Sequence, residues 1–589
     1  MTDGTALPER PPAGDHLPPA ARRARVAGWI VVLVLGAIQA WAGRFEINSD
    51  GVSYLDVGDN YFGGEWHDAI NGYWSPLYSW LLGLANVIVR PSPYWEFPLA
   101  HLVNFAIYVA ALVAFDRMLC QLIDHQRRHD NAWPAWASIG LGFGLFAWSS
   151  LVLINLTGVS PDMLVAAAVY FAAATLLRLA AEPSAATRPL LIAFGATLGL
   201  GYLSKAAMFP LAFVFLLVGA LLRGAERHRA TNAALALLAF VLVSSPFALA
   251  LSVSKGRPTF GDVGKINYAW YVNAADLGPD ELQVFRRHWH GDPPGSGTPL
   301  HGARKVADSP PIYEFGTPVG GTYPVWYDPS YWYDGLRVHV RPREQARLLV
   351  THARWYYNTF IGVPLRQLLR QGPSMRMLAD LKLVPLALIG GWVLLAYQSG
   401  RKGALAGDAL RYWFLLVPGL AACAMYALVH VEERFVAPFV VLMYLGVFAA
   451  LRLPAKRLSA FVAVVGVAVL VSFATGAVAR SVPRDWQIVE GLRSVDARPH
   501  PKIASLQYAN RVHRGWARLA RARIVAEIFP GGEDQFWSAP DSVQARVLRT
   551  FADAGADMVV AATVPVGVLP PGWRPVGATG YLAYVLTVP

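Results

Sequence analysis

Runs of about 17–22 apolar residues recur along this chain of 589 residues, and no other feature limits its fold so strongly. A helix of that length rises about 30 Å at 1.5 Å per residue, which matches the hydrocarbon core of a bilayer. Hydrophobic residues make up 55% of the chain and charged residues only 15%. Soluble globular chains have about 25% charged residues. The sequence therefore predicts an α-helical polytopic membrane protein and excludes a soluble single-domain fold.

Windows of about 19 residues predict about eleven transmembrane helices. The predicted spans are residues 26–43, 97–119, 133–154, 163–181, 189–204, 207–223, 232–252, 382–398, 412–429, 435–452 and 458–478. The first run has an alternative interpretation as a cleaved signal peptide, with "AWAG" at residues 40–43 as its candidate site. Because the run is long and many spans follow it, we interpret it as a membrane helix.

The net charge of +12 is explained by the membrane rather than by nucleic acid. Cytoplasmic loops carry an excess of Lys and Arg. The short loops on one predicted side contain Arg127, Arg128, Arg188, Arg223, Arg227, Arg229, Arg401, Lys402, Arg411, Arg452, Lys456 and Arg457. No compact basic patch with interleaved aromatic residues is present, so we expect no nucleic-acid partner.

This sidedness divides the chain into regions. Residues 1–25 form a cytoplasmic N-terminal tail, residues 26–479 a transmembrane domain, and residues 480–589 a soluble domain on the outer side. The transmembrane domain carries two long outer loops, residues 44–96 and 253–381. In the tail, "KIASLQY", "DMVVAAT" and "YLAYVLTV" predict strands and "DSVQARVLRTFADAG" predicts a helix, which together indicate a small α/β domain.

Other features of the sequence are less specific. The stretch "YPVWYDPSYWYDG" in the second outer loop is rich in aromatic rings, which suit sugar faces but also gather at membrane interfaces. Cys120 and Cys423 give neither a disulfide framework nor the spacing of a metal site.

The first outer loop opens on an acidic stretch, "NSDGVSYLDVGDNYFGGEW". Asp50 directly follows a predicted span, so its carboxylate is expected near the membrane surface, where a low dielectric raises a carboxyl pKa and suits it as a base. The alternative is that Asp50 or Asp56 caps a short helix.

Two further turns place charge at the same predicted side. Asp162 begins a span in "TGVSPDMLVAAAVY", where it could complement the helix dipole or act as a second acid. Lys205, in "LGLGYLSKAAMFP", interrupts two apolar runs on the side that the positive-inside rule disfavours. We interpret Lys205 as a phosphate ligand at headgroup depth, with snorkelling as the alternative.

The fourth turn, "HVEERFVAPF", holds His430, Glu432, Glu433 and Arg434. Arg434 could form a fork on a phosphate. The alternatives are a local salt-bridge cluster and a metal held by His430 and Glu432, although two neighbouring residues are a weak metal signal. All four turns fall on one side by a topology derived from other residues, and this coincidence favours a shared site.

These motifs resemble those of GT-C-fold glycosyltransferases that use polyprenyl-phosphate sugars, of the protein mannosyltransferase and aminoarabinose transferase type (family 39 type). "DGVSYLDVGDNYFGGEWHDAINGYWSPLYSWLLGL" resembles the first outer loop of these enzymes. "SPDMLVAAA", "YLSKAAMFP" and "EERFVAPF" are similar to their acidic, lysine-containing and arginine-containing turns. The resemblance covers about residues 26–250 and, locally, 410–450.

The resemblance implies a GT-C-like fold and a specific activity. A sugar would pass from a polyprenyl monophosphate donor to a glycan, lipid or protein acceptor on the outer side of the plasma (inner) membrane. Asp50 would be the general base, Asp162 would orient the acceptor or a divalent metal ion, and Lys205 with Arg434 would hold the lipid phosphate. Candidate acceptor or metal contacts are His67, Asp68, His430, Glu432 and Glu433.

One departure concerns the acceptor. The aminoarabinose branch tends to carry charged residues where this chain has Tyr73-Trp74-Ser75-Pro76, which speaks against a lipid A acceptor. Two other function classes are weighed against the transferase: a polyprenyl-linked glycan transporter or flippase, and a non-catalytic envelope assembly factor. A transporter should place polar residues near the bilayer midplane, whereas here the charges lie at one edge.

Overall fold

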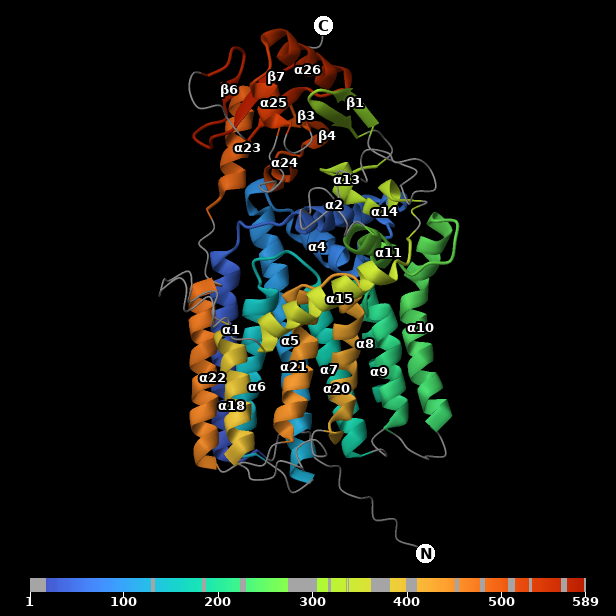
Figure 1. Ribbon diagram of the computed structural model, residues 1–589, viewed down its shortest axis with the longest axis vertical. Helices are drawn as coiled ribbons and strands as arrows, with labels where there is room; N and C mark the ends of the chain where they lie inside the picture. The colour runs from blue at the N-terminus through green and yellow to red at the C-terminus, as the bar shows by residue number, and fades with distance from the viewer. Residues whose placement is uncertain are drawn as a thin grey trace, which may run out of the picture.

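The structure, a computed structural model, describes residues 17–128, 133–182, 187–222, 229–273, 304–315, 319–334, 336, 338–361, 382–398, 410–450, 455–476, 482–506, 514–528, 532–562 and 569–586. A bundle of long helices forms one layer, and a mixed β-sheet with its own helices lies above one end of the bundle (Figure 1). Short helices fill the level between these layers, and that level holds the site described below.

Each predicted span lies on a helix of the bundle. These helices are α1 (Pro19–Ala42), α5 (Pro93–Arg128), α6 (Ala135–Trp148), α7 (Asp162–Ala181), α8 (Arg188–Ser204), α9 (Met208–Leu221), α10 (Arg229–Ser254), α18 (Leu383–Gln398), α20 (Trp413–Ala427), α21 (Glu433–Ala449) and α22 (Ala455–Gly476). Helix α6 continues directly into a π-helix, η1 (Ser149–Ile154).

Among the described residues, six segments are both long and apolar enough to cross a membrane, and they lie on α1, α5, α6 with η1, α7, α10 and α22. Helices α9, α18 and α20 are apolar but shorter. The chain is therefore a multi-pass membrane protein, as its composition predicts. The count of about eleven crossings stays a prediction.

Helix α4 (Pro76–Val89) is an apolar helix that the span prediction leaves out. Its 14 residues would rise about 21 Å, which is short of the hydrocarbon thickness. It packs against α2 (Ser49–Gly63) at the end of the bundle near the sheet. A Cβ on Gly58 would lie 2.7 Å from the carbonyl oxygen of Ser79, so only glycine allows this close approach.

The remaining helices of the intermediate level are short. They are α3 (Trp66–Ala69), α11 (Val263–Tyr268), π-helix η3 (Ala269–Asn273), α13 (Pro324–Tyr327) and α14 (Pro329–Trp332). Proline occupies the first position of α13 and α14, where its fixed φ favours a helix start and its missing N–H has no partner to lose.

The sheet contains seven strands among the described residues, in the order β1-β2-β4-β3-β5-β7-β6. The strands are β1 (Arg304–Asp308), β2 (Pro311–Glu314), β3 (Lys502–Leu506), β4 (Arg523–Ile528), β5 (Met558–Ala561), β6 (Arg574–Pro575) and β7 (Leu582–Val585). Strand β3 is parallel to β4 and β5, and the other pairs are antiparallel. The helices that accompany the sheet are α23 (Arg484–Val495), α24 (Gly515–Leu519), α25 (Glu533–Trp537) and α26 (Asp541–Asp553).

The strands predicted in the C-terminal region are β3, β5 and β7, and the predicted helix is α26. The sheet also includes β1 and β2, which come from the second outer loop, since β2 pairs with β4 through Ile312 and Ile528. Pairing across more than 200 residues leaves no local signal. That residues 480–589 form a separate domain stays a prediction.

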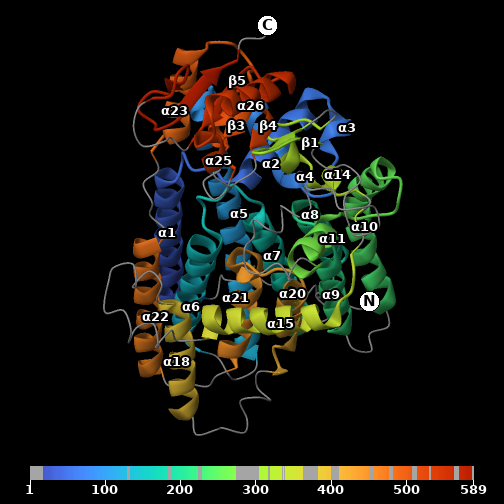
Figure 2. The same cartoon turned by 45° about the horizontal axis from the view of Figure 1, so that its top comes forward.

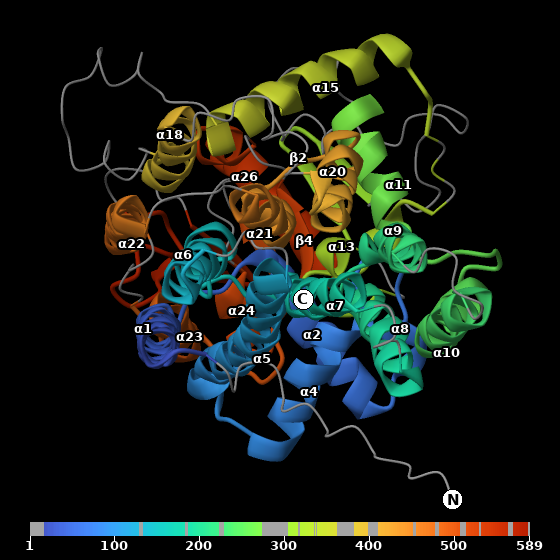
Figure 3. The same cartoon turned by 90° about the horizontal axis from the view of Figure 1, so that it is seen from below.

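Helix α15 (Pro342–Tyr356) runs across the bundle instead of along it (Figures 2 and 3). Nδ1 of His352 lies 2.7 Å from the carbonyl oxygen of Ala427. The hydroxyl of Tyr356 donates a hydrogen bond to the carbonyl oxygen of Cys423 at 2.9 Å. The first contact gives the terminal carbonyl of α20 a partner, and together they fix α15 against the end of α20.

Arg518 of α24 attaches the sheet layer to the bundle. Its guanidinium donates to Asp56 at 2.7 Å, to Asp59 at 2.6 Å and to Glu96 at 2.5 Å, so it links α24 to α2 and α5. Its side chain is only 5% exposed. Asp56 also accepts hydrogen bonds from the backbone and hydroxyl of Thr322, at 2.8 and 2.9 Å. Burial raises the pKa of Asp56, and the charge of Arg518 opposes that rise.

Replacing Arg518 by methionine is expected to destabilise the protein. The variant leaves Asp56 and Glu96 buried without their shared counter-charge, which typically costs about 3–5 kcal/mol. Chemical unfolding of the purified protein in detergent measures this loss. Arg521→Met is the matched control, because Arg521 pairs with Asp59 and Glu96 but is 38% exposed, so it should cost no more than about 1 kcal/mol. Equal losses in both variants would contradict this account of Arg518.

The stability of the protein is expected to depend on pH through Asp485 at the start of α23. Burial and the nearby charge of Glu46 raise the pKa of Asp485 to about 7, and Arg484 opposes them. Between about pH 4 and pH 7 the folded state then holds a proton that the unfolded state has lost, so the free energy of unfolding falls as pH rises.

The variant Asp485→Asn keeps this position neutral and should remove that pH dependence. It should be more stable than wild type at pH 8, by up to about 4 kcal/mol, and equal to it at pH 4. Unfolding curves at the two pH values test this, and a variant that is less stable at pH 8 would contradict it.

Candidate functional site

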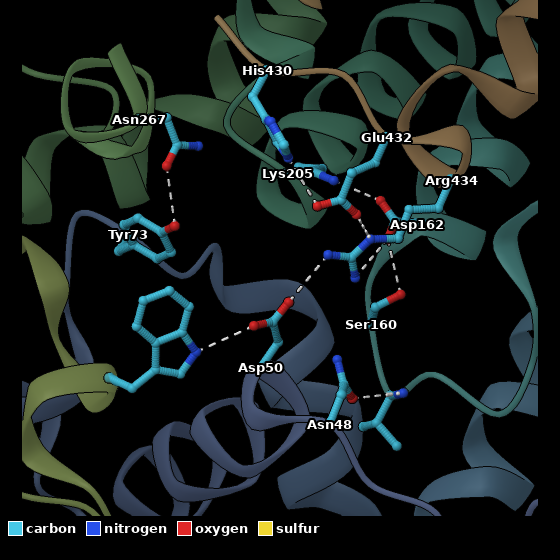
Figure 4. A network of polar contacts seen from close by, with 12 residues as sticks. Asn48, Asp50, Tyr73, Ser160, Asp162, Lys205, Asn267, His430, Glu432 and Arg434 are labelled. Atoms are coloured by element: carbon cyan, nitrogen blue, oxygen red, sulfur yellow. Dashed lines mark hydrogen bonds and ion pairs between the residues drawn. The ribbon is translucent and has the colours of Figure 1, made fainter. Parts of the chain in front are cut away.

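Four residues predicted from separate turns meet at the end of the bundle that faces the sheet (Figure 4). Asp50 lies in the first turn of α2, and Asp162 is the first residue of α7. Lys205 follows the last residue of α8, and Arg434 lies in the first turn of α21. Each of the four charges stands at the end of a helix.

The turn before α7 is held in place by α2. The π-helix η1 ends at Asn155, which has φ +67°, and this left-handed residue reverses the chain. The side-chain oxygen of Asn48, just before α2, accepts a hydrogen bond from the backbone N–H of Val159 at 3.1 Å. Ser160 then donates its hydroxyl to Asp162 at 2.9 Å. Asp50 and Asp162 thus share one rigid support.

Lys205 and Asp162 form a buried ion pair. The ammonium nitrogen lies 2.6 Å from Oδ1 of Asp162, whose side chain is 2% exposed. The same nitrogen lies 3.5 Å from the centre of the Phe435 ring, within the range of a cation–π contact. Asp162 therefore fixes the position of the lysine charge.

Arg434 joins three carboxylates. One terminal nitrogen lies 3.4 Å from Oδ2 of Asp50, and the other lies 3.7 Å from Oδ2 of Asp162. Its Nε lies 2.5 Å from Oε2 of Glu432. The guanidinium is thus the only cation, among the described contacts, shared by the two acids predicted as catalytic.

His430 and Glu432 extend the cluster. Nε2 of His430 lies 3.1 Å from Oε1 of Glu432, and the ring of His430 stacks on Tyr271 with centres 4.0 Å apart. Burial acts to raise the pKa of Glu432, but the hydrogen bond from His430 and the charge of Arg434 outweigh it and lower that pKa to about 2. Glu432 is therefore a carboxylate throughout the physiological range.

The other predicted contact residues lie elsewhere. Glu433 pairs with Lys382 at 2.7 Å. His67 is exposed on α3 and lies 3.2 Å from the carboxylate of its neighbour Asp68. Within the described part of the chain, neither His67 nor Asp68 has a polar contact with Asp50, Asp162, Lys205 or Arg434.

Trp326 is a site residue that the sequence reading did not single out. Its indole N–H donates to Oδ1 of Asp50 at 3.2 Å. It lies on α13, within the aromatic stretch noted in the sequence, which was the available signal. Tyr73 and Asn267 also approach the cluster, and the hydroxyl of Tyr73 donates to Oδ1 of Asn267 at 3.2 Å (Figure 4).

An apolar cavity of about 510 Å³ lies between α15, α18, α20 and α21. Its lining includes Tyr356, Phe360, Trp392, Cys423, Met443 and Phe448. Helix α21 connects this cavity to the charged cluster, since Arg434 lies in its first turn and Phe448 near its end. The 14 steps between these two residues correspond to about 21 Å of helix.

A metal site is not formed by these side chains. The described residues contain no group of three or more His, Cys, Asp and Glu side chains placed to hold a metal ion. At the cluster, Lys205 and Arg434 already pair with Asp50, Asp162 and Glu432, and their charges would repel a divalent cation.

No known family model matches the sequence, and no curated protein matches it. Among solved structures, the chain is similar to the oligosaccharyltransferase of Archaeoglobus fulgidus in complex with Zn and sulfate, with 13% identity and a TM-score of 0.49. This match covers 92% of the chain and 68% of the other protein.

The chain is also similar to ArnT from Cupriavidus metallidurans. The apo form gives 14% identity and a TM-score of 0.37, over 91% of this chain and 93% of that one. The form bound to undecaprenyl phosphate gives 14% identity and a TM-score of 0.38, over 96% and 99%.

Proposed function

We propose that this protein is an integral membrane glycosyltransferase that moves a sugar from a polyprenyl monophosphate donor to an acceptor on the outer side of the membrane. The observation that carries the proposal is the cluster itself: two fixed cations stand beside a carboxylate where several helices end, and an apolar cavity lies further along α21. The donor offers one negative phosphate, one long apolar chain and one sugar, and each has a counterpart at this site.

Lys205 and Arg434 supply the phosphate site. A guanidinium presents several N–H donors in a fork that suits phosphate oxygens, and an ammonium adds a compact charge. Both cations are held in position by Asp162, which is buried and bonded to Lys205 and Ser160. We infer that Asp162 acts by positioning these cations. Their charge would stabilise the phosphate as it leaves.

The apolar cavity suits the polyprenyl chain. Its lining on α21, the helix that carries Arg434, runs from Val440 to Phe448. One extended molecule could therefore place its phosphate on the guanidinium and its isoprene units among Met443, Val447 and Phe448, about 14–21 Å further along the helix. Burying such a chain releases water or lipid from apolar surface, and the phosphate fixes its register.

Asp50 is the proposed general base. It would accept the proton of an acceptor hydroxyl while that oxygen forms a bond to the anomeric carbon of the sugar. The bond between this carbon and the phosphate oxygen breaks, and polyprenyl monophosphate leaves with the electron pair. Each oxygen of Asp50 already has one donor, Trp326 or Arg434, which fixes the carboxylate for this transfer. No step requires a metal.

The charge distribution supports an outer location for the site. Helix α5 begins near Arg518 in the sheet layer and ends in Arg127 and Arg128 at the opposite end of the bundle. The positive-inside rule places the basic end in the cytoplasm, which leaves the cluster and the sheet outside.

Polyprenyl phosphate without sugar is expected to bind the wild-type protein in native mass spectrometry. Lys205→Met and Arg434→Met should each weaken this binding about 10- to 100-fold, because a hydrogen bond to a charged group contributes about 1.5–3 kcal/mol. Lys265→Met is a matched control, because Lys265 is a partly exposed lysine of α11 outside the charged cluster. Val440→Trp should fill the cavity and weaken binding without changing a charge.

Binding that is indifferent to all three site changes would overturn the phosphate assignment. It would also remove the main support for the transferase over a transporter or an assembly factor.

Asp50→Asn is expected to retain lipid binding and lose transfer. The amide keeps the size of the carboxylate but cannot accept a proton, and loss of a general base costs about 10²- to 10⁴-fold in rate. The measurement is conversion of sugar-charged to free polyprenyl phosphate in host membranes, followed by mass spectrometry. Asp68→Asn is the control. Full conversion by Asp50→Asn would show that this protein does not use Asp50 as a base.

A further inference from the structure

A wall of aromatic rings stands beside Asp50. Trp270 and Trp326 stack with centres 5.9 Å apart and planes at 16°, and Tyr73 lies 5.8 and 5.7 Å from these two rings. The rings come from three separate segments: the turn before α4, the π-helix η3 and α13. Tyr271, the neighbour of Trp270, stacks on His430 and extends the wall to the cluster.

The placement of these rings differs from that of a membrane-interface belt. Interface rings point outward to the lipid headgroups. Here Trp270 is 2% exposed, and the carbonyl of Trp326 accepts hydrogen bonds from Ser53 at 2.9 Å and from the indole of Trp74 at 3.0 Å. These bonds attach α13 to α2 and to the turn before α4, so the rings belong to the interior of the site.

Asp50 lies between the aromatic wall and the two cations that we propose bind the phosphate, Lys205 and Arg434. Trp326 donates to one of its oxygens and Arg434 lies beside the other, at 3.2 and 3.4 Å. A ligand whose phosphate lies on Arg434 would therefore carry its next group across Asp50 toward Trp326.

The space in front of this wall is lined by polar groups and reached by solvent. Figure 4 shows Tyr73, Asn267, Asp50, Arg434 and Glu432 around one recess. The side chains of Asp50, Arg434 and Glu432 are 22%, 26% and 38% exposed although other segments surround them. Carboxylate and amide oxygens accept hydrogen bonds from hydroxyl groups.

We propose that this recess binds the donor's sugar as a pyranose ring without negative charge, with its apolar C–H face on Tyr73 and Trp326. Its hydroxyls would donate to Asp50, Glu432 and the side chain of Asn267. The proposal rests on the proposed transferase function. The two carboxylates that face the recess disfavour a sugar that carries its own carboxylate.

The test compares four lipids of equal chain length in native mass spectrometry: bare polyprenyl phosphate, its mannosyl and glucosyl phosphodiesters, and a uronic-acid phosphodiester. At least one neutral sugar should raise the affinity of the wild-type protein about tenfold over bare lipid, the scale of one aromatic contact with hydrogen bonds. The uronic acid should bind no better than bare lipid.

The increment is the gain in affinity that a neutral sugar adds over bare lipid. Tyr73→Leu and Trp326→Leu should abolish it and leave binding of bare lipid within about twofold of wild type. Retained binding of bare lipid shows that each variant is folded and keeps its phosphate site. Trp66→Leu, an exposed tryptophan of the same outer loop, is the control and should keep the increment. Trp326→Phe should also keep it, since the ring remains, but should slow transfer because Asp50 loses its indole donor.

The outcomes separate this inference from the function on which it rests. Bare lipid that binds equally to wild type and to Arg434→Met would reject the donor site itself. Bare lipid that binds at Arg434 while no neutral sugar adds affinity would reject only the sugar recess. An increment that survives both leucine variants, or a uronic acid that binds best, would also overturn the recess as proposed.

Discussion

Burying an unpaired charge is costly, and one guanidinium, that of Arg434, serves Asp50, Asp162 and Glu432 as a shared partner. Each acid comes from a different segment of the chain, so the arrangement requires α2, α7 and α21 to end at one level. The same requirement brings Lys205 to Asp162. The cluster thus depends on helix ends that meet, and the bundle is the scaffold that makes them meet.

The sequence predicts this part of the structure well, because it depends on local signals. Apolar runs fix where helices lie, and basic loops fix which ends lie together, so Asp50, Asp162, Lys205 and Arg434 could be grouped before any coordinates. His67 and Asp68 were candidates because they lie near Tyr73-Trp74-Ser75-Pro76 and could substitute for the charged residues missing there. The turn of α3 exposes His67 instead, and nothing in its neighbours indicates this.

Features that depend on pairing between distant segments could not be predicted. Strands β1 and β2 join a sheet whose other strands lie about 190 residues or more further along the chain. Trp326 reaches Asp50 across 276 positions. Its stretch carries many aromatic residues, and composition alone does not say which ring faces the site or the lipid. Helix α4 was not predicted, because its 14 residues are fewer than the length by which an apolar run is recognised as a membrane span.

The Arg518 network has a consequence for how the protein is made. Asp56 and Glu96 belong to the first outer loop, yet their buried counter-charge lies 462 and 422 positions later. At about 5–20 residues per second, a ribosome needs roughly 20–90 s to cover that interval. During this time the membrane helices can insert, but α2 has no complete set of partners. The contacts that join the sheet layer to the bundle therefore form late, when α24 arrives, and a nascent chain that stops short of Arg518 lacks them.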